Sequence, residues 1–299
     1  MSTSLPSHLA WSSGGRDWRL DFDRPAVMGI VNVTPDSFSD GGLYFSPEAA
    51  VARAERHIAE GAVVVDLGAE TTRPGSEPTS AEEEWRRLEP VLAALAGHPA
   101  RPVVSVDTYK AEVAEKALDA GASMINDIYA ARKDPRILEV AARRGVPVIL
   151  MHMLGEPRTM QVEPRYDDVV REVREFLLER AGAAMAAGVP RERVILDPGL
   201  GFGKNAGHNL TLLNRFREVI PEGFHSLMAL SRKNFLGLIL GDPDPMRRDL
   251  ATAVASAIAV SKGAEMIRVH SVAGSLEAAR VAWAVLRESV ARPPDAPGA

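Results

Sequence analysis

Residues 101–128 read RPVVSVDTYKAEVAEKALDAGASMINDI and contain one complete unit of the pattern that decides the fold. An apolar run, Val103–Thr108, is followed by a stretch with the apolar spacing of a helix, Tyr109–Ala120. Gly121 then ends the predicted helix, and a second apolar run begins at Ser123. An apolar strand, a helix and another apolar strand form the signature of a parallel βαβ unit.

Similar units repeat along most of the chain. Eight strand–helix alternations predict a single-domain α/β fold, a closed (β/α)8 or TIM barrel, with a doubly wound open sheet as the alternative. No glycine-rich dinucleotide turn follows the first run, which favours the barrel. The predicted strands are Ala26–Val33, Val63–Ala69, Val103–Thr108, Ser123–Ile128, Pro147–Met153, Val194–Gly199, Ser226–Ser231 and Met266–Ser271, and the other clear helices are Pro47–Glu60, Asp167–Ala187 and Ser275–Val290.

The barrel is predicted to occupy residues 26–291. We expect residues 1–25 to form a lead-in, with a small hairpin over the barrel bottom, and residues 292–299 (RPPDAPGA) to form a disordered tail. Three helix-ending glycines, Gly145, Gly188 and Gly263, support the boundaries of the inner units.

The composition excludes several functions. The 299 residues include no cysteine, so disulfides, thiolate metal sites and cysteine nucleophiles are excluded. The formal net charge of −5 argues against nucleic acid as the main partner. The sequence has no apolar stretch of the roughly 18 residues that a membrane span requires. It also shows no secretory signal, so we expect a cytoplasmic protein.

Polar side chains end every predicted strand. The carboxyl ends of barrel strands meet at one mouth, where barrel active sites lie. Side chains alternate along a strand, so Arg268 and His270 can both face inward, whereas only one of Asn126 and Asp127 can. His152 is interpreted as a structural histidine. The strand-end residues are Asn32, Asp66, Asp107, Asn126, Asp127, His152, Asp197, Ser231–Lys233, Arg268 and His270.

Four loops at this end have unusual compositions. Residues 32–42 (NVTPDSFSDGG) and 70–76 (ETTRPGS) are typical of loops that close over a ligand. Residues 197–205 (DPGLGFGKN) are glycine-rich but have neither P-loop nor Rossmann spacing. Residues 231–234 (SRKN), together with Arg268 and His270, place cations where barrels frequently bind phosphate. The mouth is therefore predicted to bind an anionic small molecule.

These segments, together with SVDT, IND, MHM and RVH, closely resemble the dihydropteroate synthase family of pterin-binding barrels, from about Ala26 to Val290. The resemblance implies a transferase of folate biosynthesis. Such an enzyme joins 6-hydroxymethyl-7,8-dihydropterin diphosphate to 4-aminobenzoate and releases 7,8-dihydropteroate and diphosphate, with Mg²⁺ as cofactor. It also implies a homodimer formed through the last helices, and residues 250–260 and 278–286 are apolar enough for that role.

The resemblance also implies a role for each matching residue. The implied catalytic residues are Asn32, Arg73, Asp107, Lys233, Arg268 and His270. Pterin would be bound by Asp107, Asn126, Asp197, Phe202, Lys233 and Arg268. Diphosphate would be bound by Asn32, Thr72, Arg268 and His270, with Asn32 also the metal ligand. Aminobenzoate would be bound by Phe38, Arg73, Pro74 and Ser231.

The implied mechanism is a dissociative displacement in which diphosphate leaves before the arylamine attacks. It needs no strong general base, because a neutral arylamine is already nucleophilic. The chain departs from the family pattern at a few loop positions, none of which is an implied ligand: Thr71, Tyr129, Ala130, Ala229 and Ser271.

Three other functions compete with this one. A methyltetrahydrofolate–corrinoid methyltransferase would share the pterin pocket, but it would lack the SRK and RVH cations and the NVTPDSFSDGG loop. A non-enzymatic paralogue would have no reason to keep Asn32, Arg73 and Lys233. A sugar-phosphate aldolase or isomerase would need a Schiff-base lysine or a carboxylate base deep in the barrel, and Lys233 is the one lysine at a predicted strand end.

Overall fold

Eight parallel strands form a closed barrel in the computed structural model, which describes residues 5–34, 46–71, 78–156 and 160–290. The last strand pairs with both its predecessor and the first barrel strand, so the (β/α)8 prediction is confirmed and the open sheet is excluded. In order around the barrel, the strands are β3 (Ala26–Asn32), β4 (Val64–Gly68), β5 (Val103–Asp107), β6 (Met124–Asp127), β7 (Val148–Met151), β8 (Val194–Asp197), β9 (His225–Ala229) and β10 (Met266–Val269).

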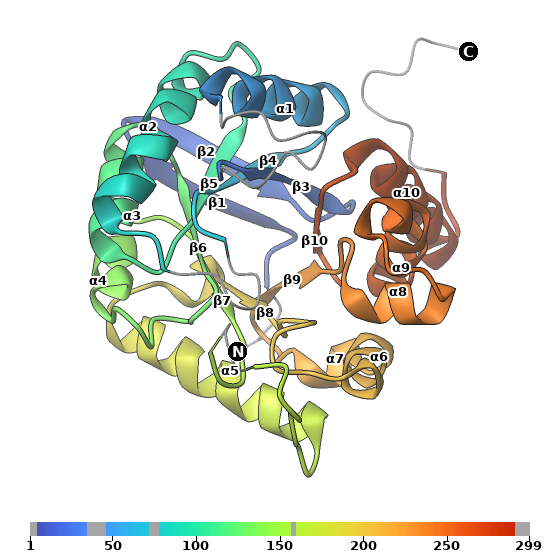
Figure 1. Ribbon diagram of the computed structural model, residues 1–299. Coiled ribbons are helices and arrows are strands. Elements are labelled where there is room, and N and C mark those ends of the chain that lie inside the picture. The colour runs from blue at the N-terminus through green and yellow to red at the C-terminus, as the bar shows by residue number, and fades with distance from the viewer. Residues whose placement is uncertain (1–4, 35–45, 72–77, 157–159, 291–299) are drawn as a thin grey trace.

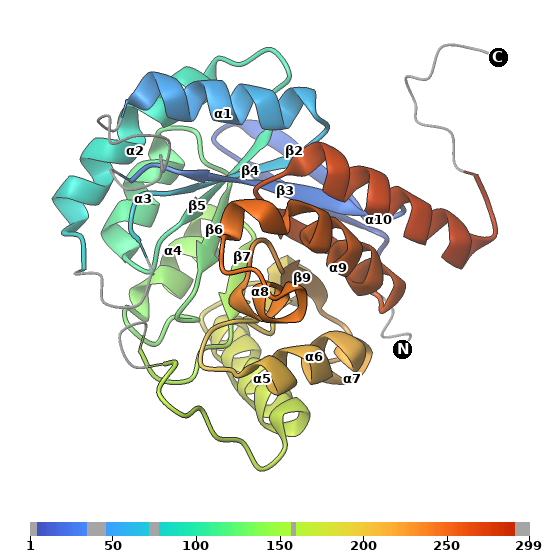
Figure 2. The ribbon, with the colours of Figure 1, turned by 45° about the vertical axis from the view of Figure 1, so that its right-hand side comes forward.

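Helices surround the strands (Figure 1), and α9 and α10 lie side by side (Figure 2). The last helix begins at Val272, three residues before the predicted start, because it follows β10 with almost no loop. It ends at Arg287, before Glu288 turns to a φ of 48°. The helices are α1 (Pro47–Ala59), α2 (Ala81–Ala96), α3 (Ala111–Asp119), α4 (Arg136–Arg144), α5 (Val169–Ala186), α6 (Ala206–Asn214), α7 (Phe216–Val219), α8 (Asn234–Leu240), α9 (Asp249–Ser261) and α10 (Val272–Arg287), with 3-10 turns η2 (Arg191–Arg193) and η3 (Pro245–Arg248).

Local chemistry sets the helix boundaries. Asp168 caps α5 by accepting the N–H groups of Val170 and Arg171, two of the amides that a helix start leaves unpaired. Gly145 ends α4 with a φ of 65°, and its N–H returns to the last turn of the helix. The two caps fix where α5 begins and where α4 ends.

An antiparallel hairpin, β1 (His8–Ser13) and β2 (Arg16–Asp21), precedes the barrel. It buries Trp11 and Leu20 against the core. The ring of Phe22, just after the hairpin, lies 4.5 Å from that of His225, the first residue of β9. The hairpin therefore covers the amino ends of the strands and leaves the carboxyl ends as the mouth. The predicted tail, residues 292–299, lies outside the described residues.

Within the described ranges, no helix combines the length and apolarity that crossing a bilayer requires.

Candidate active site

Arg268 of β10 connects two carboxylates at the mouth of the barrel. Its Nε donates a hydrogen bond to Oδ2 of Asp66 at 2.6 Å, and its Nη2 donates to Oδ2 of Asp107 at 2.7 Å. The side-chain amide of Asn126 donates to the same Asp66 oxygen at 3.0 Å. Strands β4, β5, β6 and β10 thus each contribute one side chain to a single charged network.

Burial and charge act against each other in this network. Burial raises the pKa of Asp107, the positive charge of Arg268 opposes that shift, and the nearby Asp66 carboxylate adds to it. The hydrogen bonds of Arg268 lie in the plane of its guanidinium group, so they occupy its edge and leave its faces for stacking. The arrangement therefore holds a flat cation at the mouth in one fixed orientation.

A second cluster joins the loop after β8 to the loop after β9. Oδ1 of Asp197 accepts the N–H of Gly199 at 2.7 Å, and Nζ of Lys233 lies 4.1 Å from the centre of the Phe202 ring. Gly201 has a φ of 81°, and a Cβ there would lie 3.0 Å from Cδ of Lys233. The glycine therefore gives the lysine side chain its room.

The two charged groups of this cluster have shifted pKa values. Burial raises the pKa of Asp197 to about 6, against the attraction of Lys233. Burial also lowers the pKa of Lys233 to about 8, against the attraction of Asp197. Arg268 is close enough to act on both groups, so the two clusters form one site.

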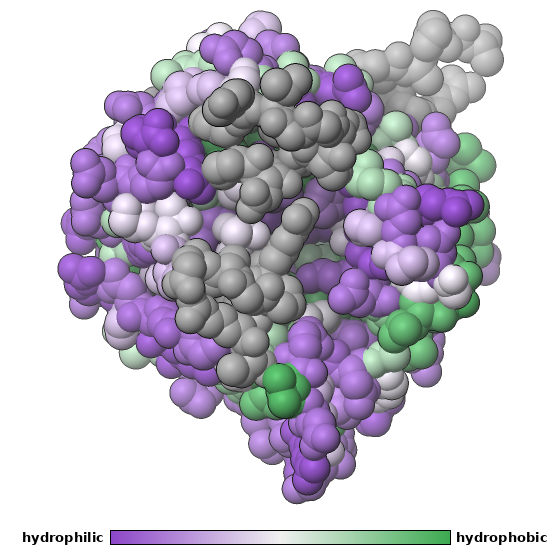
Figure 3. All heavy atoms as spheres, viewed as in Figure 1, coloured by the Kyte–Doolittle hydropathy of each residue, from purple (hydrophilic) through white to green (hydrophobic). Residues whose placement is uncertain are grey.

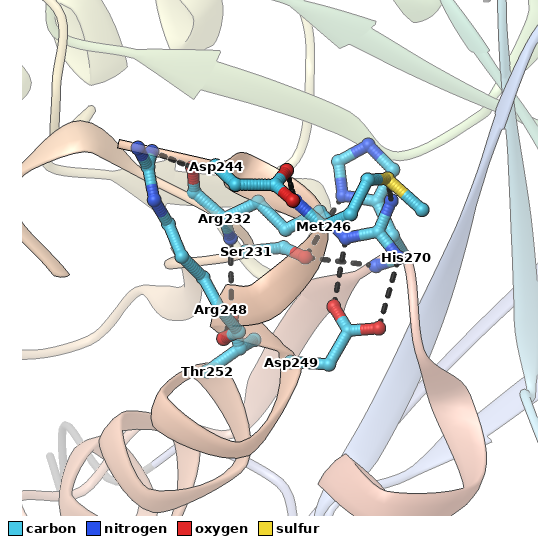
Figure 4. A network of polar contacts seen from close by, with 8 residues as sticks. All are labelled: Ser231, Arg232, Asp244, Met246, Arg248, Asp249, Thr252 and His270. Atoms are coloured by element: carbon cyan, nitrogen blue, oxygen red, sulfur yellow. Dashed lines mark hydrogen bonds and ion pairs between the residues drawn. The ribbon is translucent and has the colours of Figure 1, made fainter. Parts of the chain in front are cut away.

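Residues of α9, and Arg248 just before it, hold the turn at Arg232, as Figure 4 shows. Arg232 has a φ of 57°, which L-residues rarely adopt. Its N–H donates to Oγ1 of Thr252 at 3.1 Å, and its guanidinium donates to both oxygens of Asp249 at 2.7 and 2.9 Å. Arg248 donates to the carbonyl of Arg232 at 3.0 Å. These bonds offset the backbone strain and fix the two residues that flank Arg232.

His270 packs against the same turn. Its N–H donates to Oγ of Ser231 at 3.0 Å, and its Nδ1 lies 2.8 Å from that oxygen. Burial, followed by the charges of Arg232, Arg268 and Lys233, lowers its pKa to about 3. His270 is therefore a neutral imidazole at neutral pH. If the Ser231 hydroxyl donates to Nδ1, the ring proton lies on Nε2 and can be donated to a ligand.

The loop after β6 shows what one departure from the family pattern does. Ala130 stands where the pattern has glycine, and it has a φ of 50°. Asp127 accepts the N–H of Tyr129 at 2.8 Å and that of Ala131 at 2.6 Å, which stabilises the turn without the glycine. Tyr129 packs its ring edge-on against Tyr109, with 4.9 Å between ring centres. Asp127 therefore points away from the mouth, and Asn126 is the inward member of the pair.

The structure brings most of the predicted site residues together. Asp107, Asn126 and Arg268 belong to the first cluster, and Asp197, Phe202 and Lys233 to the second. Ser231 and His270 are bonded to each other at the edge of the second cluster, and Asn32 is exposed at the end of β3. The other predicted residues, Phe38, Thr72, Arg73 and Pro74, lie outside the described residues.

Two residues that the structure shows to be well connected, Asp66 and Lys204, received no role from the sequence. Asp66 was noted as a strand-end carboxylate but given no role, although it binds both Arg268 and Asn126. Its shared face with Gly68 on an apolar strand was the available signal. His152 is buried and hydrogen-bonded, as expected of a structural histidine, but its partner Lys204 was not predicted.

Comparisons with known proteins identify the family and agree with the fold. A family model described as "Pterin binding enzyme" matches residues 28–270. A dihydropteroate synthase of Escherichia coli K12 is 46% identical over 269 residues, which are 89% of this chain and 94% of the relative. The chain belongs to the dihydropteroate synthase family of pterin-binding enzymes.

Solved structures of this family have the same fold. Dihydropteroate synthase of Xanthomonas albilineans with 4-aminobenzoic acid has a TM-score of 0.85 at 45% identity, covering 93% of this chain and 98% of that one. The same enzyme with 7,8-dihydropteroate has a TM-score of 0.82 at 43% identity and the same coverage. As a member of the dihydropteroate synthase family, the chain is a transferase of folate synthesis.

Proposed function

We propose that the mouth condenses 6-hydroxymethyl-7,8-dihydropterin diphosphate with 4-aminobenzoate to give 7,8-dihydropteroate and diphosphate. The observation that carries the proposal is that buried acceptors and buried cations line the same mouth. Asp107, Asn126 and Asp197 can accept the ring and exocyclic N–H groups of a pterin, while Lys233 can donate to its carbonyl. Relatives solved with 4-aminobenzoic acid and with dihydropteroate support both substrates.

Arg268 has two tasks in this proposal. Its faces, which its bonds to Asp66 and Asp107 leave available, stack on the flat heterocycle. Its positive charge favours the departure of the diphosphate, together with His270 and Thr72. Phe38, Arg73 and Pro74 complete the aminobenzoate site with Ser231.

Asn32 fits a magnesium ion that binds with the diphosphate. Its amide is exposed at the mouth and makes no hydrogen bond within the part of the chain that the structure describes. No group of three or more His, Asp or Glu with metal-binding spacing occurs among those residues. A single amide oxygen suits Mg²⁺, which keeps several waters and takes phosphate oxygens as further ligands. When bound, the ion would neutralise charge on the leaving diphosphate.

The chain's own groups favour a dissociative reaction. The mouth offers cations for the leaving group and a flat pocket that holds the dihydropterin while its methylene carbon carries positive charge. The neutral arylamine then attacks that carbon and loses a proton to solvent. Positioning and charge stabilisation carry the catalysis, and no side chain has to act as a strong base.

One assay tests the proposed function. The protein is given the dihydropterin diphosphate, 4-aminobenzoate and Mg²⁺, and release of diphosphate and formation of dihydropteroate are recorded. We expect both products in equal amounts. Tight pterin binding without either product would favour a binding protein, and transfer of a methyl group from methyltetrahydrofolate would favour the corrinoid-dependent alternative.

The affinity for dihydropterin is expected to be highest between pH values of about 7 and about 8, because the acceptors Asp107 and Asp197 have pKa values of about 7 and about 6 and the donor Lys233 has one of about 8. Asp197 accepts hydrogen bonds fully only when ionised, above its pKa, and Lys233 donates as an ammonium below its own. Titrations from about pH 5 to about pH 10 measure the loss of affinity toward low pH, the acid limb, and toward high pH, the alkaline limb. Lys233→Arg stays charged throughout, so its alkaline limb should disappear while the acid limb remains. A flat wild-type profile would contradict this assignment.

The proposal includes a cytoplasmic homodimer. Exposed apolar side chains lie on α8, α9 and α10, and Figure 3 shows a hydrophobic band on that side of the molecule. On α9, Leu250 and Val254 are 78% and 53% exposed and stand one helical turn apart. A second copy of the chain would cover them. In this patch, the other large exposed apolar residues on these three helices are Leu238, Ile239, Leu240, Ile258, Val281, Val285 and Leu286.

Val254→Asp is expected to give a monomer, because it would bury a charge in the apolar interface. Sedimentation velocity should show the 32.2 kDa chain for this variant and about twice that mass for the wild type. Leu178→Asp, on α5 outside the patch, serves as the control and should remain dimeric. A wild-type protein that sediments as a monomer at high concentration would refute the dimer.

A further inference from the structure

Lys204 is a buried cation that the proposed reaction does not use. It ends the DPGLGFGK segment and is only 2% exposed. Its Nζ donates to Nδ1 of His152 at 2.8 Å, to the carbonyl of Gly199 at 2.9 Å and to the carbonyl of Phe202 at 3.0 Å. A longer contact of 3.5 Å joins it to the carbonyl of His152. An ammonium group has three hydrogens, so the three nearer acceptors satisfy it, whereas a neutral amine would turn a lone pair toward one of them.

His152 is suited to be one of these acceptors. Burial, followed by the charges of Lys204 and Arg132, lowers its pKa to about 2, so the ring is neutral. Because the ammonium can only donate, Nδ1 accepts and the ring proton lies on Nε2. The ring is also held edge-on against Phe176, with 4.8 Å between ring centres. The histidine is therefore a fixed acceptor on the wall of the barrel.

The other two acceptors belong to the segment that forms one side of the pterin pocket. Gly199 gives its N–H to Asp197 while its carbonyl faces Lys204. The carbonyl of Phe202 also faces Lys204, while its ring faces Lys233. Gly199 has a φ of 64°, and a Cβ there would lie 1.9 Å from the carbonyl oxygen of His152. The backbone thus makes a tight turn that directs two carbonyl groups at the ammonium group.

We infer that Lys204 is a positioning residue of the pterin pocket, whose ammonium group fixes the backbone between Asp197 and Phe202. This inference rests on the proposed function. Lys204 makes its bonds to the backbone of the loop and to His152, so it acts through Asp197 and Phe202. Its charge has a second effect, because a nearby cation favours the ionised form of Asp197.

The charged groups around Asp197 allow this second effect to be measured. Burial raises the pKa of Asp197, and Lys233, Arg268 and Lys204 oppose that shift. In turn, burial lowers the pKa of Lys204, Asp197 opposes that shift, and Lys233 adds to it. Removing the charge of Lys204 should therefore move the acid limb of pterin binding to higher pH. A purely structural residue would lower the affinity without moving that limb.

The test compares pterin binding by Lys204→Met and by His152→Leu. The methionine variant keeps an unbranched chain but removes the charge and every hydrogen bond of the ammonium group. We expect its dissociation constant for dihydropterin to rise by about 10- to 100-fold, as the loss of charged hydrogen bonds implies. The acid limb should move to higher pH, and the KM for aminobenzoate at saturating pterin should stay nearly unchanged. Lys116→Met, an exposed lysine on α3, is the matched control and should bind as the wild type does.

His152→Leu separates geometry from charge. It removes one acceptor but keeps the ammonium group, so pterin binding should weaken while the acid limb stays in place. The inference is overturned if Lys204→Met binds pterin within about twofold of the wild type. The inference is also overturned if Lys204→Met loses affinity for pterin and aminobenzoate to the same extent while the acid limb stays at the same pH. Failure of the wild type itself to bind dihydropterin would instead overturn the proposed function.

Discussion

Arg268→Met is expected to lower kcat/KM by about 1,000-fold or more, because transition-state charge loses its main cation. The same change should destabilise the fold by about 3–5 kcal/mol, the usual cost of removing one partner from a buried ion pair. Asp66 and Asp107 would remain behind, fully and largely buried, without the group that neutralises them. Diphosphate release measures the first effect, and urea denaturation measures the second.

A second substitution separates the two losses. Asp66→Asn in the Arg268→Met background removes one of the uncompensated carboxylates, so it should restore part of the stability and none of the activity. Arg86→Met is the surface control, because Arg86 is 70% exposed and pairs with Glu83 on α2. That change should leave the midpoint of urea denaturation nearly unchanged. Near-normal kcat/KM in Arg268→Met would contradict the role given to this arginine.

Lys233→Met is expected to raise the dissociation constant for dihydropterin by about 100-fold or more, because charged hydrogen bonds contribute about 1.5–3 kcal/mol each. The substitution also removes the cation that most strongly favours the ionised form of Asp197, so the carboxylate would ionise at higher pH. Titration calorimetry with the pterin gives the affinity, and it should be run above pH 8 as well as at neutrality.

Arg73→Ala is the counterpart to this variant. It should leave pterin affinity unchanged and raise the KM for aminobenzoate, because Arg73 is assigned to the second substrate. The two variants together would show that the pockets are separate. If Arg73→Ala lost pterin binding and Lys233→Met kept it, the two assignments would have to be exchanged.

The barrel and its mouth could be predicted because both depend on local pattern. An apolar run that ends in a polar residue shows where a strand begins and where its functional end lies. The inward position of Arg268 followed from alternation along the strand. The placement of His270 and Ser231 at one mouth also followed, because both end predicted strands that are neighbours in the barrel.

Partners across the barrel could not be predicted in the same way. Arg247 and Arg248 are adjacent in the sequence, yet the first is exposed and the second is buried against the Ser231–Lys233 turn. Lys204 received no role from the sequence, and only the fold shows its ammonium group bonded to His152. Whether a cation is buried or exposed at these positions depends on which backbone carbonyls face it. The apolar periodicity of the sequence does not indicate the direction of those carbonyls.

The hydrogen bond between Arg268 and Asp66 joins residues 202 positions apart, and it also has a consequence for folding. Asp66 and Asp107 are made early during synthesis, whereas Arg268 lies on the last strand, which closes the barrel against β3. In a partly folded chain without β10, the two carboxylates would have no cation between them. Burying them would cost free energy, so they would stay in contact with water. Helices form from local contacts, but this site requires contacts between residues far apart in the sequence. Recovery of pterin binding during refolding therefore reports ring closure, after most secondary structure has already formed.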